Sequence, residues 1–180
     1  KFIFVFRVNK NLHVNIASSG SLVTSVMKGL TKAEEQHSAR RHNKRIAGIQ
    51  EWADQAASTK SKWARRNQYF KKCDLAYLEF LIPVGSRILE LGCGSGRILA
   101  SLDPSVGVGV DISHKMISLA QSNYSNLTFF QGDIENTDLI ERVKKYGPYD
   151  FILLDNTLGY VSDIQVYLQN IQPLFLANTR

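Results

Sequence analysis

The segment that decides the fold reads RILELGCGSGR and covers residues 87–97. Its first five residues are typical of a buried strand, because apolar side chains stand on both sides of the chain. Three glycines at alternate positions, Gly92, Gly94 and Gly96, follow directly, and a helix is expected over 95–102. A strand, a glycine-rich turn and a helix in this order predict a nucleotide-type ligand bound close to the backbone.

Strands and helices alternate through the rest of the chain. The expected strands cover residues 106–110, 127–131 and 149–154, and the expected helices cover 113–124, 137–146 and 161–175. Apolar strands separated by helical segments predict a parallel sheet with helices on both faces. Because the crossovers of such sheets are right-handed, the sequence predicts an α/β fold with a doubly wound, mainly parallel Rossmann-like sheet.

An α-helical segment is expected before this sheet. Thr31, followed by Glu34, fits a capping box, and a mostly exposed helix is expected to run to about Ala57. An apolar stripe at helical spacings predicts a second helix over 61–81. The predicted divisions are a lead-in (1–30), N-terminal helices (31–82) and the sheet domain (83–180).

The lead-in contains two β-like stretches, residues 2–8 and 12–16. Neither has the length of a signal peptide, and no run in the chain approaches the roughly 18 apolar residues of a membrane helix. Cys73 and Cys93 have no histidine partners at metal spacing, so neither a disulfide framework nor a metal site is predicted. We expect an intracellular, cytoplasmic protein.

The excess positive charge lies in front of the predicted sheet. The chain carries a net charge of +6, to which residues 1–30 contribute +4, residues 31–80 contribute +5 and residues 81–180 contribute −3. A basic N-terminal face suits the phosphates of a nucleic acid or an anionic membrane, whereas a solvated helix face explains the same charge. Both interpretations stay open.

Carboxylates follow the next two predicted strands, at the sheet edge where ligands of such folds bind. Asp111 comes nineteen residues after Gly92, where a carboxylate can bind ribose hydroxyls; capping of the next helix is the alternative. Asp133 could accept a hydrogen bond from an adenine amine, with Ile134 against the ring. The last glycine of a dinucleotide fingerprint would fall at Arg97, which disfavours a nicotinamide or flavin dinucleotide.

Together these motifs resemble the class I S-adenosylmethionine-dependent methyltransferases, over about residues 87–175. The resemblance rests on Glu90 to Gly96, on Val110-Asp111-Ile112-Ser113 with Met116 and Ala120, on Gly132-Asp133, and on Tyr149 to Asp155. The family sheet normally continues for about three more strands. The resemblance therefore implies a C-terminally truncated domain that keeps the cofactor half, loses much of the acceptor half and leaves the 149–154 strand as an open edge.

The resemblance also implies the roles of individual residues, with S-adenosylmethionine as the cofactor and S-adenosylhomocysteine as its product. The implied cofactor-binding residues are Glu90, Gly92, Cys93, Gly94, Gly96, Asp111, Ile112, Met116, Asp133, Ile134, Asp155 and Asn156. Asp155 is also the candidate catalytic base, and a purely structural role at the strand end is its alternative. The residues implied to cover the substrate or cofactor are Trp63, Arg66, Asn67 and Tyr69, for which core packing and solvation are the alternative.

The expected function is methyl transfer to a small-molecule, sugar or lipid-linked acceptor, at oxygen. The segment Asp155-Asn156-Thr157-Leu158 lacks the Pro-Pro-aromatic signature of methyltransferases that act on planar amino groups. Two alternatives remain: an RNA methyltransferase guided by the basic N-terminal helices, and a non-catalytic methyltransferase-like binding module. A small-molecule or glycan-type acceptor is therefore the expected partner, and nucleic acid is the less favoured one.

Overall fold

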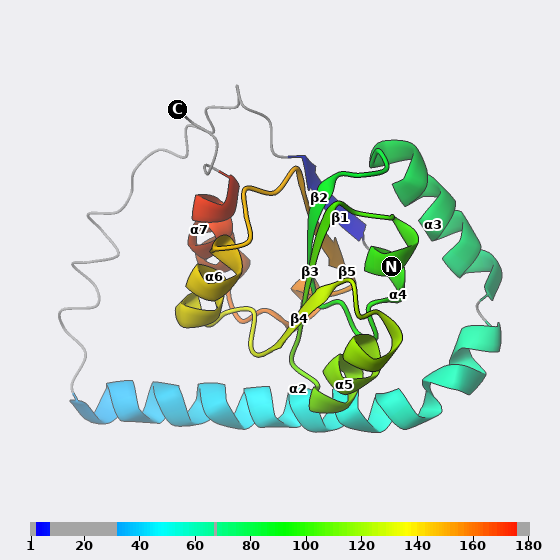
Figure 1. Ribbon diagram of the computed structural model, residues 1–180. Coiled ribbons are helices and arrows are strands. Elements are labelled where there is room, and N and C mark those ends of the chain that lie inside the picture. Colours follow the sequence, from blue (N-terminus) through cyan, green and yellow to red (C-terminus); the bar gives the residue numbers. More distant parts are fainter. Residues whose placement is uncertain (1–2, 8–31, 67, 176–180) are drawn as a thin grey trace.

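The structure, a computed structural model, describes residues 3–7, 32–66 and 68–175. Its elements are shown in Figure 1. In chain order they are β1 (Ile3–Arg7), α2 (Lys32–Arg66), α3 (Gln68–Leu81), β2 (Arg87–Leu91), α4 (Arg97–Ser101), β3 (Val106–Asp111), α5 (His114–Asn123), β4 (Thr128–Gln131), α6 (Thr137–Lys144), β5 (Phe151–Asp155), the 3-10 turn η1 (Leu158–Tyr160) and α7 (Ile164–Phe175).

The sheet has the order β1-β5-β2-β3-β4. Strands β2 to β5 pair with one another in parallel, and β1 runs antiparallel to β5. The chain passes from β2 outward to β3 and β4 and then returns to the other side of β2 to form β5. The strand order thus reverses at β2, which confirms the predicted doubly wound α/β sheet and places a ligand-binding crevice at the carboxyl end of β2.

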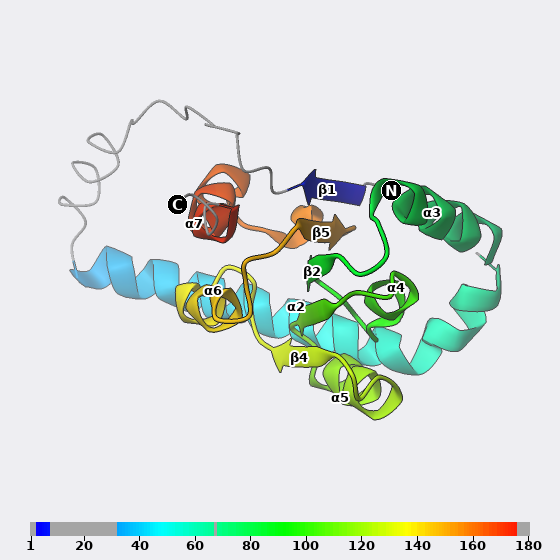
Figure 2. The same ribbon diagram turned by 45° about the horizontal axis from the view of Figure 1, so that its top comes forward.

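Helices cover both faces of the sheet (Figure 2). On one face, α6 and α7 bury Val143, Tyr167 and Ile171 against strand residues such as Leu89 and Val110. On the other face, α3, α4 and α5 pack against the alternate strand positions. The helices contribute Leu78, Leu99 and Ile117, and the strands contribute Ile88 and Leu153. The strands are buried on both sides, which explains why the sequence has continuous apolar runs there.

The N-terminal helices are divided differently from the prediction. A boundary was expected between residues 57 and 61, but α2 continues to Arg66 and α3 begins at Gln68. Residues 58–66 contain no proline or glycine, so nothing in this segment forces a helix to end. None of the helices in the described ranges has the length and apolar character needed to cross a lipid bilayer.

The expectation of an open sheet edge at β5 is wrong. Residues 3–7, from the first β-like stretch, pair antiparallel with the whole of β5, so that Ile3 lies opposite Asp155 and Arg7 opposite Phe151. The second β-like stretch, 12–16, lies outside the described residues. β1 thus pairs with the backbone N–H and C=O groups that β5 would otherwise present to other chains.

Candidate active site

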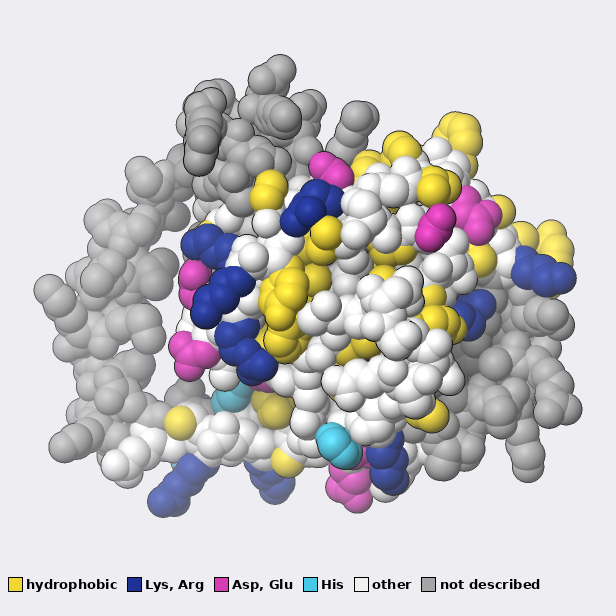
Figure 3. Space-filling view, viewed as in Figure 1, with side chains coloured by type: hydrophobic (Ala, Val, Ile, Leu, Met, Phe, Trp, Pro, Cys, Tyr) yellow, Lys and Arg dark blue, Asp and Glu magenta, His cyan; other side chains and the backbone are white. Residues whose placement is uncertain are grey.

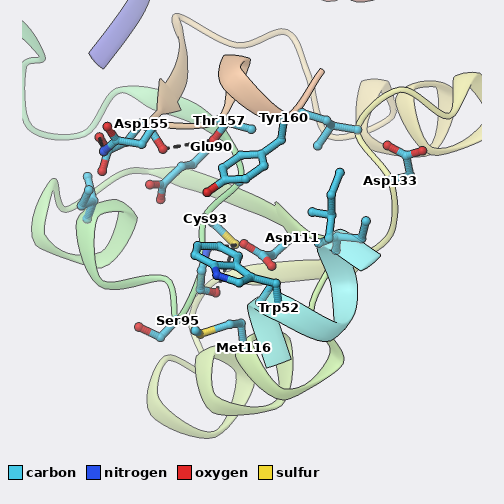
Figure 4. A pocket seen from close by; sticks show the side chains of 18 of the residues that line it. Trp52, Glu90, Cys93, Ser95, Asp111, Met116, Asp133, Asp155, Thr157 and Tyr160 are labelled. Carbon is cyan, nitrogen blue, oxygen red and sulfur yellow. Dashed lines mark hydrogen bonds between the residues drawn. The ribbon is translucent and has the colours of Figure 1, made fainter. Parts of the chain in front are cut away.

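A cavity of about 960 Å³ opens at the carboxyl ends of the parallel strands. The loops after β2, β3, β4 and β5 line it, and α2 lies across its mouth (Figures 1 and 4). Its size is at the upper end of the range of small-molecule sites. The cavity lies where the strand order reverses, as expected for a ligand site in a doubly wound sheet.

Eleven of the twelve predicted cofactor residues border this one cavity: Glu90, Gly92, Cys93, Gly94, Asp111, Ile112, Met116, Asp133, Ile134, Asp155 and Asn156. Gly96, the twelfth, is buried behind the loop with a φ of +73°, and a Cβ on it would come 2.6 Å from the Phe129 ring. Because Gly96 has no side chain, the N-terminus of α4 can pack closely against Phe129 of β4.

The glycine loop is fixed by the strand beside it. The amides of Gly92 and Cys93 donate to the carbonyl of Val110, at 2.7 and 2.8 Å. Glu90 is 1% exposed, and its Oε2 accepts a hydrogen bond from the Leu99 amide at 3.2 Å. This buried carboxylate therefore holds the first turn of α4 against the end of β2.

Asp111 connects two of the loops. Its Oδ2 accepts a hydrogen bond from the Gly94 amide at 2.7 Å, and its Oδ1 accepts one from the Ser113 amide at 2.9 Å. The cap of α5 is Ser113, whose Oγ accepts from the Met116 amide at 3.1 Å, so Asp111 does not have that capping role. The Asp111 carboxylate is held in a fixed orientation at the cavity wall.

The loop after β4 carries two carboxylates. Asp133 Oδ1 accepts from the Glu135 amide at 3.0 Å, and its Oδ2 lies 3.3 Å from His42 Nε2 of α2. Burial alone would raise the pKa of Glu135, but hydrogen bonds from Ser162 and Arg45 outweigh it and lower the pKa below 4.5. Glu135 is therefore an anion at neutral pH.

The loop after β5 forms the remaining wall. Asn156 has a φ of +56°, and its Nδ2 donates to Asp155 Oδ1 at 2.5 Å. The Thr157 hydroxyl donates to the Asp155 carbonyl at 3.1 Å. The side chains after Asp155 thus fold back on it and fix the strand end at the cavity.

Sequence reasoning missed the part of the cavity that α2 and η1 supply. The residues of this part are Ile46, Ile49, Trp52, Ala53 and Gln55 of α2 and Tyr160 of η1. Glu135, in the loop after β4, also lines the cavity and was missed. The rings of Trp52 and Tyr160 lie 5.6 Å apart, centroid to centroid, over the mouth (Figure 4). The signal was present in the sequence, because Ile46, Ile49 and Ala53 recur at helical spacings in a helix otherwise expected to be exposed.

Of the four predicted covering residues, Tyr69 has a described side chain, and it is not among the residues that line the cavity. Tyr69 is 74% exposed, because α3 turns this side chain away from the sheet. Asn67 and the side chains of Trp63 and Arg66 lie outside the described residues. From α3, Asp74 and Leu75 line the cavity instead.

The residues present fit a nucleoside-type cofactor such as S-adenosylmethionine. Carboxylates that can accept hydrogen bonds from hydroxyl or amine groups stand at two loops, on Asp111 and Asp133. The same cavity is lined by the apolar side chains of Ile112, Met116 and Ile134, which can pack against a flat ring. This alternation of apolar walls and a few polar groups is typical of cofactor pockets.

The chain is similar to known methyltransferases. A malonyl-[acyl-carrier protein] O-methyltransferase of Bacillus cereus is 37% identical over an alignment of 91 residues, and the match covers 47% of this chain and 32% of that protein. An uncharacterised protein of Methanocaldococcus jannaschii is 31% identical over 81 residues, 45% of this chain and 31% of that protein. The chain thus spans about a third of the length of these curated relatives.

Among solved structures, a methyltransferase of Thermotoga maritima shares the fold. That protein is described as S-adenosylmethionine-dependent and as a possible histamine N-methyltransferase. The likeness has a TM-score of 0.56 at 20% identity and covers 70% of this chain and 56% of that one. The expected Rossmann-like methyltransferase fold is therefore confirmed. Residues 82–178 match the profile of the methyltransferase domain family, and the chain belongs to that family.

Proposed function

We propose that this chain binds S-adenosylmethionine in the cavity at the strand ends and takes part in methyl transfer to an oxygen atom of a small-molecule, sugar or lipid-linked acceptor. The observation that carries the proposal is the position of Asp111, held by the Gly94 and Ser113 amides in a cavity bordered by most of the expected cofactor residues. Family membership supports the reaction class.

The adenosine part is assigned to the loops after β3 and β4. Asp111 accepts hydrogen bonds from the ribose hydroxyls, because its carboxylate lines the cavity beside the glycine loop. Asp133 accepts one from the adenine amine, and Ile112, Met116 and Ile134 pack against the ring. Because both carboxylates have backbone partners, they need little reorganisation when the ligand arrives.

The methionine part is assigned to the glycine loop. Gly92, Cys93 and Gly94 place backbone at the cavity wall, and the carboxylate of Glu90 orients the loop through the Leu99 amide. Gly96 shapes the loop from behind. The absence of side chains at Gly92 and Gly94 lets the ligand approach the main chain.

The acceptor end is assigned to the loop after β5. When bound, the cofactor supplies an electrophilic methyl group, so the protein has to align the acceptor with it. Asp155 accepts the proton of an acceptor hydroxyl as the carbon–oxygen bond forms and the carbon–sulfur bond breaks. Asn156 fixes the orientation of the Asp155 carboxylate. Support for oxygen as the acceptor atom comes from the B. cereus relative, which is an O-methyltransferase by name.

RNA is a second candidate acceptor, favoured by the position of the basic residues. Figure 3 shows Lys and Arg side chains over α6 and along the edge formed by α2. Arg40, Arg41 and Lys44 are exposed on α2, which also covers the cavity mouth. Binding of a polynucleotide that weakens steeply with salt would favour this alternative.

Calorimetric titration with S-adenosylhomocysteine tests the proposal. The wild-type protein should bind it, and Asp111→Asn should bind about 10- to 100-fold more weakly, since hydrogen bonds to a charged group are lost. Asp103→Asn is the matched control, because Asp103 is exposed and does not line the cavity. NADH should give no heat. A folded wild-type protein that gives no heat with S-adenosylhomocysteine would overturn the proposal.

A further inference from the structure

Arg45 of α2 joins two loops that border the cavity from different strands. Its Nη2 donates to Glu135 Oε2, in the loop after β4, and to Ser162 Oγ at 3.2 Å. Its Nη1 donates to the carbonyl of Tyr160, in the segment after β5. One guanidinium therefore links the helix that covers the cavity to two of the cavity's walls.

The contact is a closed network. The Ser162 amide donates to Glu135 Oε1 at 3.0 Å, and the Ser162 hydroxyl donates to the same oxygen. The side chain of Glu135 is 14% exposed and that of Arg45 is 31% exposed, so solvent screens this pair less than it screens an exposed ion pair. The hydrogen bonds that lower the pKa of Glu135 keep it charged.

Residues that the proposed function assigns to the adenosine part and to the acceptor end lie on either side of this network. Asp133, assigned to adenine, lies two residues before Glu135 and pairs with His42, which is one helical turn before Arg45. Tyr160 offers its carbonyl to Arg45 and its ring to Trp52 over the mouth of the cavity (Figure 4). The network thus lies between the adenosine side and the acceptor side.

Arginine is suited to this task because of its shape. A guanidinium presents several N–H donors in one rigid plane, whereas a lysine ammonium is a compact charge on a flexible stem. Simultaneous contacts with a carboxylate, a hydroxyl and a carbonyl need the several N–H groups that a guanidinium holds in one plane. A lysine would keep the charge but lose the fixed relation between the two loops.

We propose that Arg45 is a positioning residue that couples cofactor binding at the loop after β4 to the placement of Tyr160 and Trp52 over the acceptor end. The inference rests on the proposed function. A cofactor held by Asp133 fixes the position of the loop that carries Glu135. Because Arg45 bonds to this loop and to residues 160–162, those residues and α2 are fixed as well. Release of the product then requires these contacts to open, so Arg45 slows the dissociation of S-adenosylhomocysteine.

The test uses Trp52 as a reporter. The chain has two tryptophans, so Trp63→Phe leaves Trp52 as the sole one. In this background, stopped-flow fluorescence measures the dissociation rate of S-adenosylhomocysteine, and acrylamide quenching measures the shielding of Trp52 with and without the ligand. The variants are Arg45→Ala, Arg45→Lys, Glu135→Gln and the Arg45→Ala/Glu135→Gln pair. Arg41→Ala, an exposed arginine one turn earlier on α2, is the matched control.

Both Arg45 variants should release S-adenosylhomocysteine about tenfold faster and lose the ligand-dependent shielding of Trp52. Glu135→Gln should have a similar effect, and the pair should be no worse than the stronger single variant, because the two residues act through one contact. Arg41→Ala should behave as wild type. Arg45→Lys keeps the charge and the aliphatic stem, so it decides the question if Arg45→Ala fails to fold.

The outcomes separate this inference from the proposed function. If wild type binds the ligand but Arg45→Lys releases it at the wild-type rate with unchanged Trp52 shielding, Arg45 does not couple the loops, and the proposed function stands. If a folded wild-type protein does not bind S-adenosylhomocysteine, the proposed function fails and the coupling fails with it.

Discussion

Gly92 and Thr157 touch across the ends of β2 and β5: a Cβ added to Gly92 would lie 2.1 Å from Thr157 Oγ1. The backbone of Gly92 has a φ of +87°, a value that residues other than glycine rarely adopt. The glycine loop and the loop after β5 therefore meet directly, and the absence of a side chain at residue 92 allows this close approach.

Gly92→Ala should lower the affinity for S-adenosylhomocysteine by at least about tenfold and the free energy of unfolding by about 1–3 kcal/mol, because strain and overlap add. Adding Thr157→Ala should restore only part of both, since the positive φ remains. Calorimetry and urea unfolding measure these changes. Gly159→Ala is the matched control, because its added Cβ would meet nothing within 4 Å. Equal behaviour of the two alanine variants would contradict the close contact.

Two buried tyrosines should respond oppositely to loss of their hydroxyls. The Tyr149 hydroxyl donates to the Val143 carbonyl at 2.5 Å, so Tyr149→Phe should lower the free energy of unfolding by roughly 1 kcal/mol. Tyr167 is 1% exposed, and its hydroxyl has no partner among the described residues. Tyr167→Phe should leave stability unchanged or raise it by up to about 1 kcal/mol. Urea unfolding compares them, and an equal loss in both would refute the prediction.

Glu135 should make stability depend on acid pH. Its folded-state pKa is lowered below the ordinary 4.5, so its contribution is complete above that pH and is lost as the pH falls through the folded-state pKa. The difference in unfolding free energy between wild type and Glu135→Gln should therefore be greatest at neutral pH and shrink below pH 4.5. Urea titrations across this range measure it. A difference that stays constant into acid would mean that the carboxylate is not stabilised by Ser162 and Arg45.

Ser113 should matter to α5 more than its partner Asp54 does. The Ser113 hydroxyl caps α5 through the Met116 amide and donates to Asp54 of α2. Ser113→Ala loses both contacts and should lower the free energy of unfolding by about 1–2 kcal/mol. Asp54→Ala keeps the Ser113 cap and loses the longer bond of 3.4 Å from the Lys115 amide, so it should cost less while still loosening α2 from α5. Thermal unfolding with hydrogen exchange of α5 amides separates the two; protection of α5 that falls equally in both would argue against the cap.

The sheet and most of its ligand loops were predictable because their signals are local. Each parallel strand is a short apolar run bounded by turn residues. The strand, the glycines and the helix start that predict a nucleotide-type ligand all lie within residues 87–97. Asp111 could be placed because it directly follows such a run. These features do not depend on how distant segments pack.

The cover of the cavity could not be predicted, because it depends on distant contacts. The sequence offered two tryptophans in helical surroundings, and only the path of α2 across the strand ends shows that Trp52 meets Tyr160. Arg45 is one of several basic residues on a polar helix, and its partners lie about ninety residues or more further along the chain. β1 was visible as a β-like stretch, but a sequence pattern does not name the strand with which it pairs.

The pairing of β1 with β5 has a consequence for the order of folding. These strands are separated by almost the whole described chain, so their contacts contribute strongly to the contact order, which slows folding. On the ribosome, β1 emerges early and has to wait until β5 has been synthesised before it gains its neighbour. The parallel strands can associate beforehand through β2, which pairs with both β3 and β5. Among the described strands, β1 is thus expected to join the sheet last, because its one neighbour is β5.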